Sequence, residues 1–86
     1  MNRTQILHTL LNIARQVLDE PALSFDEGTP FEEIENWDSL NHLRMVVQME
    51  ATFELQFGNS DLLRLKRVGD LISVIERRRD GAGPAR

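Results

Sequence analysis

The chain of 86 residues has no cysteine and no tyrosine, and it contains a single tryptophan. The absence of cysteine excludes a disulfide framework, a cysteine-ligated metal site and a thiol nucleophile. No apolar run approaches the roughly 18 residues that a membrane-spanning helix needs, so we expect no membrane span. The N-terminal segment lacks the pattern of a signal peptide, because Arg15 interrupts it and no small-residue cleavage site follows. We therefore expect a cytoplasmic protein.

Positive charge is missing from a long stretch in the first half of the sequence. No Lys or Arg occurs between Arg15 and Arg44, and the net charge of the chain is -4. This balance disfavours nucleic acid as a partner. One end of the folded molecule should carry a negative field that attracts a basic partner, unless the acids only form a solvated loop. The acidic residues of the stretch, eight of the 14 in the chain, are Asp19, Glu20, Asp26, Glu27, Glu32, Glu33, Glu35 and Asp38.

The length and composition indicate one small globular domain. Apolar residues make up 41% of the chain and charged residues 28%, which is typical of globular proteins. A chain of 86 residues leaves no room for a second domain or a deep substrate cleft. We expect a monomeric domain over residues 1–80 and a flexible C-terminal tail over 81–86, with the sequence GAGPAR.

Apolar residues recur with the spacing of a helix in three segments. They predict helices over about 3–18, 39–54 and 68–79, and a short fourth helix is expected over 60–65. No segment indicates a strand, so the fold class is all-α: a small four-helix bundle with a long loop between the first two helices. Three arginines at the end of the last helix should complement its dipole. The expected caps and stops are Asn2 or Thr4, Pro21, Asp38, and Ser60 or Asp61.

The loop over 19–38 shows no sustained period. Twenty residues without structure are uncommon in a compact domain, and such loops are usually functional or contain a short helix. We expect a helical turn at 31–35. The residues expected to pin the loop onto the bundle are Phe25, Phe31, Ile34 and Trp37.

Ser39 is expected in the first turn of the helix over 39–54, directly after Asp38. The first turn of a helix presents unpaired N–H groups and the positive end of the dipole, which favour a phosphate ester. Catalysis by Ser39 would need a base that a third group orients. His42 lies three residues further on, but the sequence offers it no evident orienting partner and no oxyanion hole. We therefore predict that Ser39 is modified and that the protein is not an enzyme. We also expect no metal site, because the loop acids lack the spacing of a calcium loop.

The residues around Ser39 carry a family resemblance. The sequence resembles acyl carrier proteins, the small four-helix carriers of fatty-acid and polyketide assembly, over roughly residues 3–79. The motif Asp38-Ser39-Leu40 looks like the one that opens the family's second helix. The segments TPFEEIENWDSL, MEATFELQF and RVGDLISVI resemble the end of the family's first loop, the end of its second helix and the start of its last helix.

The resemblance implies a function for a discrete single-domain carrier. A phosphopantetheinyl transferase, using magnesium, would attach 4'-phosphopantetheine from coenzyme A to Ser39, and Asp38 would support this modification besides capping the helix. The thiol of the arm would hold an acyl group as a thioester. A loading ligase or acyltransferase and downstream biosynthetic enzymes would be the further partners.

The resemblance also implies a docking surface on and beside the second helix. The family's apolar patch is matched by Leu40, Leu43 and Val47. For Leu43, a place in the hydrophobic core is at least as good an explanation. Arg44 falls where the family often has Glu, and a partner with Lys or Arg opposite it would meet like charge. We therefore predict that the carrier serves a specialised biosynthetic pathway, polyketide-like or otherwise secondary. The alternative is that the charge at this surface position varies freely and has no functional meaning. The expected docking residues are Leu40, Asn41, Leu43, Arg44, Val47, Glu50 and Phe57.

Two other functions stay open at this point. An aminoacyl or peptidyl carrier uses the same arm, but such carriers more often show Gly-Gly-His-Ser, where this chain has Asn36-Trp37-Asp38-Ser39. A helical interaction module that is never modified is the second alternative. Met45, Val46 and Met49 are expected in the interior, where core packing explains them better than a channel for the acyl chain.

Overall fold

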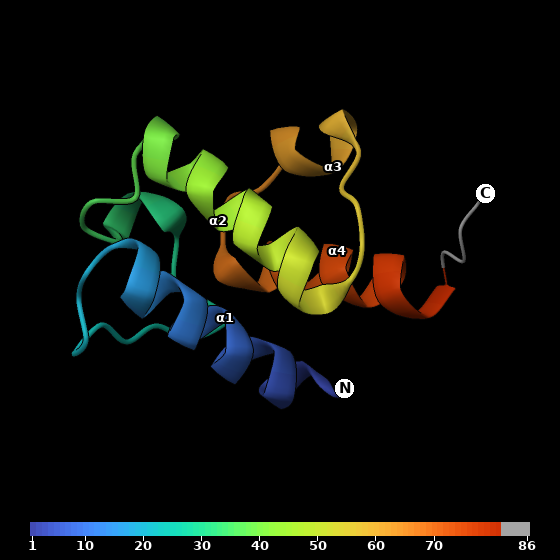
Figure 1. Ribbon diagram of the computed structural model, residues 1–86, viewed down its shortest axis with the longest axis horizontal. Helices are drawn as coiled ribbons and strands as arrows, with labels where there is room; N and C mark the ends of the chain where they lie inside the picture. Colours follow the sequence, from blue (N-terminus) through green and yellow to red (C-terminus); the bar gives the residue numbers. More distant parts are fainter. Residues whose placement is uncertain (82–86) are drawn as a thin grey trace.

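The computed structural model describes residues 1–81, which form an all-α bundle as predicted (Figure 1). Within these residues there is no β-strand, and one isolated antiparallel bridge joins Pro30 to Arg67. Of the expected tail over 81–86, only Gly81 lies within the described residues. The elements are α1 (Arg3–Val17), the 3-10 turn η1 (Phe31–Glu33), α2 (Ser39–Phe53), α3 (Asn59–Leu63), α4 (Val68–Glu76) and the π-helical turn η2 (Arg77–Gly81).

The first helix begins at a reciprocal cap. The Asn2 side chain accepts a hydrogen bond from the Gln5 N–H at 2.8 Å, and the Gln5 side chain accepts one from the Asn2 N–H at 2.9 Å. This capping box satisfies two backbone donors at once, so Asn2 and not Thr4 is the N-cap. The helix ends at Val17, before Pro21, and Asp19 turns the chain with a φ of 55°.

The core lies between α1, α2 and α4. Side chains from the crossover complete it, because Phe25 and Ile34 are buried and Phe31 and Trp37 pack against the buried cluster. The predicted pinning of the loop is therefore confirmed, while its helical turn is shorter than the expected 31–35. The side chains with the lowest exposure are Ile6, Leu10, Met45, Met49, Leu71, Ile72, Ile75 and Val68.

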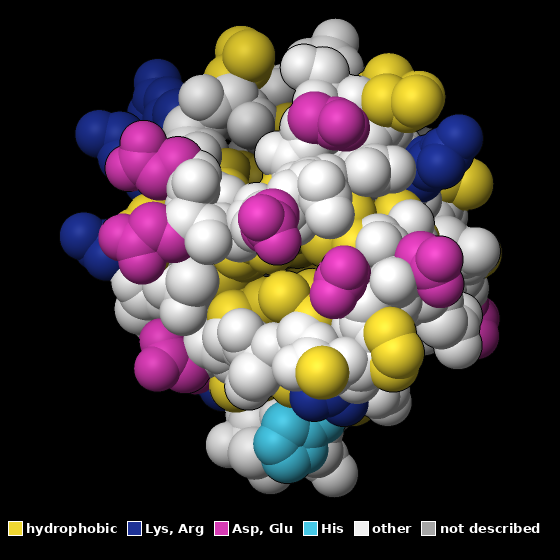
Figure 2. Space-filling view, turned by 90° about the vertical axis from the view of Figure 1, so that its left-hand side faces the viewer, with side chains coloured by type: hydrophobic (Ala, Val, Ile, Leu, Met, Phe, Trp, Pro, Cys, Tyr) yellow, Lys and Arg dark blue, Asp and Glu magenta, His cyan; other side chains and the backbone are white. Residues whose placement is uncertain are grey.

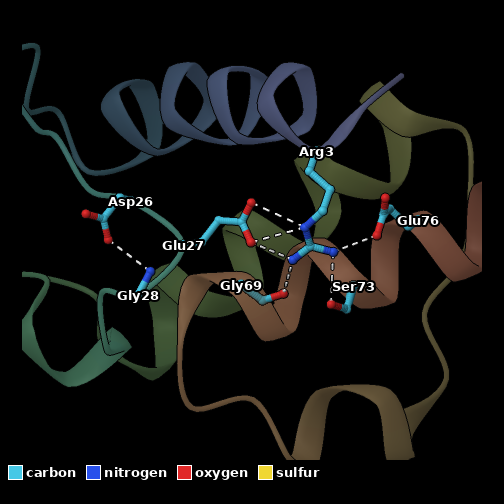
Figure 3. A network of polar contacts seen from close by, with 7 residues as sticks. All are labelled: Arg3, Asp26, Glu27, Gly28, Gly69, Ser73 and Glu76. Atoms are coloured by element: carbon cyan, nitrogen blue, oxygen red, sulfur yellow. Dashed lines mark hydrogen bonds and ion pairs between the residues drawn. The ribbon is translucent and has the colours of Figure 1, made fainter.

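Arg3 ties three distant segments together (Figure 3). Its guanidinium lies 2.6 Å from a Glu27 carboxylate oxygen in the crossover and 2.6 Å from a Glu76 carboxylate oxygen in α4. It also donates to the Ser73 hydroxyl at 3.1 Å and to the Gly69 carbonyl at 3.2 Å. The Gly69 N–H in turn donates to the Glu27 carbonyl at 2.8 Å. The start of α1 thereby holds the crossover against α4.

The short helix α3 differs from its predicted span of 60–65. It begins at Asn59 with Gly58 as N-cap, so neither Ser60 nor Asp61 is the cap. Asp61 sits at the third helical position, from which its carboxylate reaches back to accept from the Gly58 N–H at 2.8 Å. A carboxylate in this position serves the same unpaired donors as a cap does.

The arginines after α4 also differ from the prediction. The α-helix ends at Glu76 and not at 79, and the turn η2 follows it. Arg78 Nε donates to Asp61 Oδ2 at 2.7 Å, and Arg77 Nη2 lies 3.4 Å from Asp61 Oδ1. Two of the three arginines, which were expected to complement the dipole of the last helix, therefore contact Asp61 of α3.

None of the helices in the described part of the chain is long and apolar enough to cross a membrane. The same residues contain no group of three or more His, Asp and Glu side chains that could hold a metal ion.

Candidate attachment site and its groove

Ser39 is the first residue of α2 and is exposed. Asp38 is the N-cap, as predicted, because its Oδ1 accepts from the Asn41 N–H at 2.9 Å. The Asp38 carbonyl accepts the first backbone bond of the helix, from the His42 N–H at 2.8 Å. The serine hydroxyl consequently stands on the surface at the positive end of the α2 dipole.

The chain approaches Ser39 through a fixed turn. Asn36 has a φ of 69°, in the left-handed region that Asn tolerates better than most residues. Its carbonyl accepts from the Asn41 side-chain amide at 2.8 Å. The Trp37 ring lies against the Phe31 ring of η1, with centroids 4.8 Å apart. These contacts tie η1, the end of the crossover and the first turn of α2 into one unit.

Trp37 is also the orienting partner that the sequence did not reveal for His42. The Trp37 indole N–H donates to His42 Nδ1 at 3.0 Å. A partly buried indole N–H usually has a hydrogen-bond acceptor. Here the donor lies in the loop and the acceptor lies in the first turn of α2. The bond requires a neutral imidazole, and burial lowers the pKa of His42, which favours the neutral form. With Nδ1 as the acceptor, the ring proton lies on Nε2.

This pairing does not make a catalytic dyad with Ser39. In a serine hydrolase the group behind the histidine accepts a hydrogen bond and stabilises the imidazolium that forms. Trp37 donates instead, so it stabilises the neutral ring and disfavours the protonated one. The geometry agrees with a serine that another protein modifies.

A groove opens beside Ser39 between the start of α2 and the short helix α3. Its volume is about 460 Å³. Apart from Asp38 and His42, the side chains that line it carry no ionisable group. The lining residues are Phe31, Trp37, Asp38, Ser39, His42, Leu43, Leu62 and Leu65.

The outward face of α2 carries an apolar stripe. Leu40 is 58% exposed, Leu43 62% and Val47 66%. Leu43 is therefore a surface residue and not part of the core. Arg44 is exposed on the same face, and Leu63 of α3 is 82% exposed.

The remaining residues predicted for docking are engaged within the protein. The Glu50 carboxylate accepts from the Phe57 N–H at 3.0 Å. Phe57 is partly buried and packs against the core. The Asn41 side chain holds the carbonyl of Asn36, as described above. These three residues shape the rim of the α2 face.

Acidic side chains gather at the end of the molecule where the crossover and the start of α2 meet. Figure 2 looks onto this end and shows acidic groups spread over it, with hydrophobic side chains visible between them. The exposed acids closest to Ser39 in the sequence are Glu32, Glu33, Glu35 and Asp38. The negative end expected from the sequence is present.

The described residues form a four-helix bundle with an exposed serine directly after a capping aspartate, and this serine has no catalytic dyad. This is the architecture of a carrier protein. Comparison with protein families gives the same result, since the model of the family described as "Phosphopantetheine attachment site" matches residues 8–75. The chain belongs to this family of acyl-carrier-type proteins. Its cofactor is covalently attached 4'-phosphopantetheine, and the protein carries substrates without being an enzyme itself.

Solved structures of acyl carrier proteins are similar to the chain, among them the following two. A holo acyl carrier protein from Geobacter metallireducens, solved by solution NMR, is 33% identical, with a TM-score of 0.76 over 84% of this chain and 83% of that one. A crystal structure of an acyl carrier protein from Thermotoga maritima is 23% identical and shares the fold, with a TM-score of 0.79 over 91% of each chain. A search of curated proteins gave no match.

Proposed function

We propose that this protein carries acyl groups as thioesters on a 4'-phosphopantetheine arm joined to Ser39. The observation that supports Ser39 most strongly is its exposure as the first residue of α2, at the mouth of the groove. A phosphodiester at this place is stabilised by the unpaired N–H groups and the dipole of the helix start. The residues present therefore fit the arm, whose terminal thiol supplies the thioester chemistry.

The chain contributes position to the attachment, and the transferase contributes the chemistry. The Ser39 oxygen forms a bond to phosphorus as the pyrophosphate link of coenzyme A breaks and its nucleotide part leaves. The hydroxyl proton passes to a base of the transferase, because neither nitrogen of His42 is available to accept it: Nδ1 accepts from the Trp37 indole, and Nε2 carries the ring proton. Asp38 uses only Oδ1 for the cap, so its second oxygen is free to attract a cationic group of the transferase.

Intact-mass measurement tests the attachment. Incubation with coenzyme A and a broad-specificity phosphopantetheinyl transferase should add one phosphopantetheine to the wild-type protein and none to Ser39→Ala. Ser60→Ala is a matched control, because Ser60 is also exposed in the first turn of a helix. It should be modified like the wild type. No mass gain in the wild type would support an unmodified interaction module, and a gain that survives Ser39→Ala would place the arm elsewhere.

The cargo is proposed to be acyl and to be exchanged at the α2 face. Three exposed apolar side chains, Leu40, Leu43 and Val47, offer a partner enzyme a stripe that leads to Ser39. Asn41, Glu50 and Phe57 would border this surface. Loading assays with acyl and aminoacyl ligases on the holo protein separate the acyl carrier from the aminoacyl alternative.

A specialised set of partners is the finer part of the proposal. Arg44 places a cation in the middle of the docking face, which favours a partner that presents a carboxylate and disfavours one that presents Lys or Arg. Arg44→Glu should slow acyl transfer to the native partner by roughly tenfold, the effect of about 1.4 kcal/mol. Gln48→Glu, one turn further on and exposed, is the control for added negative charge and should change transfer less. Unchanged or faster transfer by Arg44→Glu would contradict the idea.

A further inference from the structure

His42 and Ser39 share one wall of the groove. They lie three residues apart in α2, a spacing that puts their Cβ atoms about 5–6 Å from each other. Side chains of a helix lean towards its N-terminus, so the imidazole leans towards the serine. Both residues line the groove, and Trp37 lines it with them. The imidazole is thus close enough to Ser39 to contact a phosphate group attached to its hydroxyl oxygen.

The hydrogen bond from Trp37 leaves one side of the imidazole ready to donate. Nδ1 accepts from the indole at 3.0 Å, so the neutral ring carries its proton on Nε2. Within residues 1–81 no hydrogen bond involves Nε2, and no buried side-chain nitrogen or oxygen lacks a partner. Nε2 is therefore accessible from outside, in a residue that lines the groove.

We propose that His42, oriented by Trp37, is a positioning residue for the prosthetic group and donates a hydrogen bond from Nε2 to the phosphodiester attached at Ser39. The inference rests on the attachment proposed above. It assigns each nitrogen of the ring a different partner: the loop tryptophan on one side and an anionic phosphate oxygen on the other. The arm would then leave Ser39 along the groove between α2 and α3, in a direction that His42 sets.

The arrangement couples the arm to the protonation of His42. A protonated imidazole has an N–H on both nitrogens, so Nδ1 can no longer accept from Trp37. The negative phosphodiester favours that protonated form, whereas burial of the ring disfavours it. Among the groove-lining residues only Asp38 adds another charge. Phe31 of η1, Leu62 of α3 and Leu65, which follows α3, are uncharged. Asp38 is present in both apo and holo protein, so a difference between the two forms reports on the phosphate.

NMR titration of the full chain in its apo and holo forms tests the proposal. Intact mass first establishes that the arm is attached, so a failure of the attachment is distinguished from a failure of the inference. In the holo form the ratio of protonated to neutral His42 at a given pH should rise at least about threefold, as expected for one unit charge at this distance. The signal of the Trp37 indole proton should change at the same pH as the His42 ring. The ring signals of His8, which is exposed on α1, serve as the internal chemical-shift reference.

Two variants separate positioning from a structural role. His42→Gln keeps an acceptor for Trp37 and a donor for the phosphate, whereas His42→Leu has neither. The ³¹P signal of the phosphodiester should stay close to the wild-type position in the Gln variant and move in the Leu variant. Identical His42 titration in apo and holo protein, or a wild-type ³¹P signal in both variants, would overturn the proposal even if His42→Leu lowers the melting temperature.

Discussion

Asp61 holds the short helix α3 against the turn that follows α4, and its removal can be predicted quantitatively. Only 8% of its side chain is exposed. The carboxylate accepts from the Gly58 N–H at 2.8 Å and lies 2.6 Å from Arg78 Nη2. Asp61→Asn keeps the shape and one acceptor for Gly58, but it removes the charge and turns an NH₂ group towards the arginine.

The expected loss follows from the exposure of the two partners. A hydrogen bond to a charged group contributes about 1.5–3 kcal/mol, and an exposed ion pair contributes about 0.2–1 kcal/mol. The Arg78 side chain is 35% exposed and can be solvated again when Asp61 is neutral. We therefore expect Asp61→Asn to lower the free energy of unfolding by about 1–2 kcal/mol. In a domain of this size such a change lowers the melting temperature by about 4–16 °C.

The pH dependence of this loss identifies its cause. Burial acts to raise the pKa of Asp61, but the Gly58 N–H and the arginines outweigh it, so the pKa lies below its ordinary value. The stabilisation is then complete above the pKa of an unfolded Asp, about 3.9, and is lost as the pH falls through the lower folded value. In thermal and urea unfolding, followed by circular dichroism, the free energies of unfolding of the wild type and of Asp61→Asn should become equal in acid. A constant difference between wild type and Asp61→Asn from pH 7 into this range would refute the reasoning, and Glu33→Gln controls for loss of an exposed carboxylate.

Three further predictions concern the core, a close contact and the cap. Met49→Ala removes a fully buried side chain and should lower the free energy of unfolding by about 2–5 kcal/mol in urea unfolding. Gly69→Ala should lower the melting temperature although Ala favours helices by about 1 kcal/mol, because its Cβ would lie 3.0 Å from the Glu27 carbonyl; a higher melting temperature would contradict this. Asp38→Ala should cost about 1 kcal/mol through the lost bond to the Asn41 N–H and should slow arm attachment in a mass-based time course.

The helices, and Ser39 as the first residue of α2, were accessible from the sequence because their signals are local. Periodicity placed α1, α2 and α4 within a few residues of their bounds, and Asp38 marked the start of α2. Met45 and Met49 were correctly expected inside, but periodicity could not assign Leu43 to one of the two apolar faces of α2. The helix has two such faces, with Met45 and Met49 buried and Leu43 exposed. Only the position of α1 and α4 against one face resolves the choice.

The polar contacts between distant segments, and those at the groove, were not accessible in the same way. Arg3 meets Glu27 and Glu76, which are 24 and 73 residues away in the chain. No spacing rule connects such positions, because the fold and not the local sequence brings them together. The bond between Trp37 and His42 spans only five residues, but it crosses from a loop into a helix, where helical spacing does not apply. A single tryptophan two residues before the serine was the available signal.

Trp37 gives the carrier an optical property. It is the single tryptophan of a chain that has no tyrosine, and its ring lies at the groove beside Ser39. Nearly all of the protein's near-ultraviolet emission should therefore come from one indole, which lines the same groove as Ser39. Because the emission of an indole depends on its hydrogen bond and on its contact with water, attachment of an arm at Ser39 should change the wavelength and intensity of this emission. The unlabelled protein would thus contain its own fluorescent reporter of arm attachment.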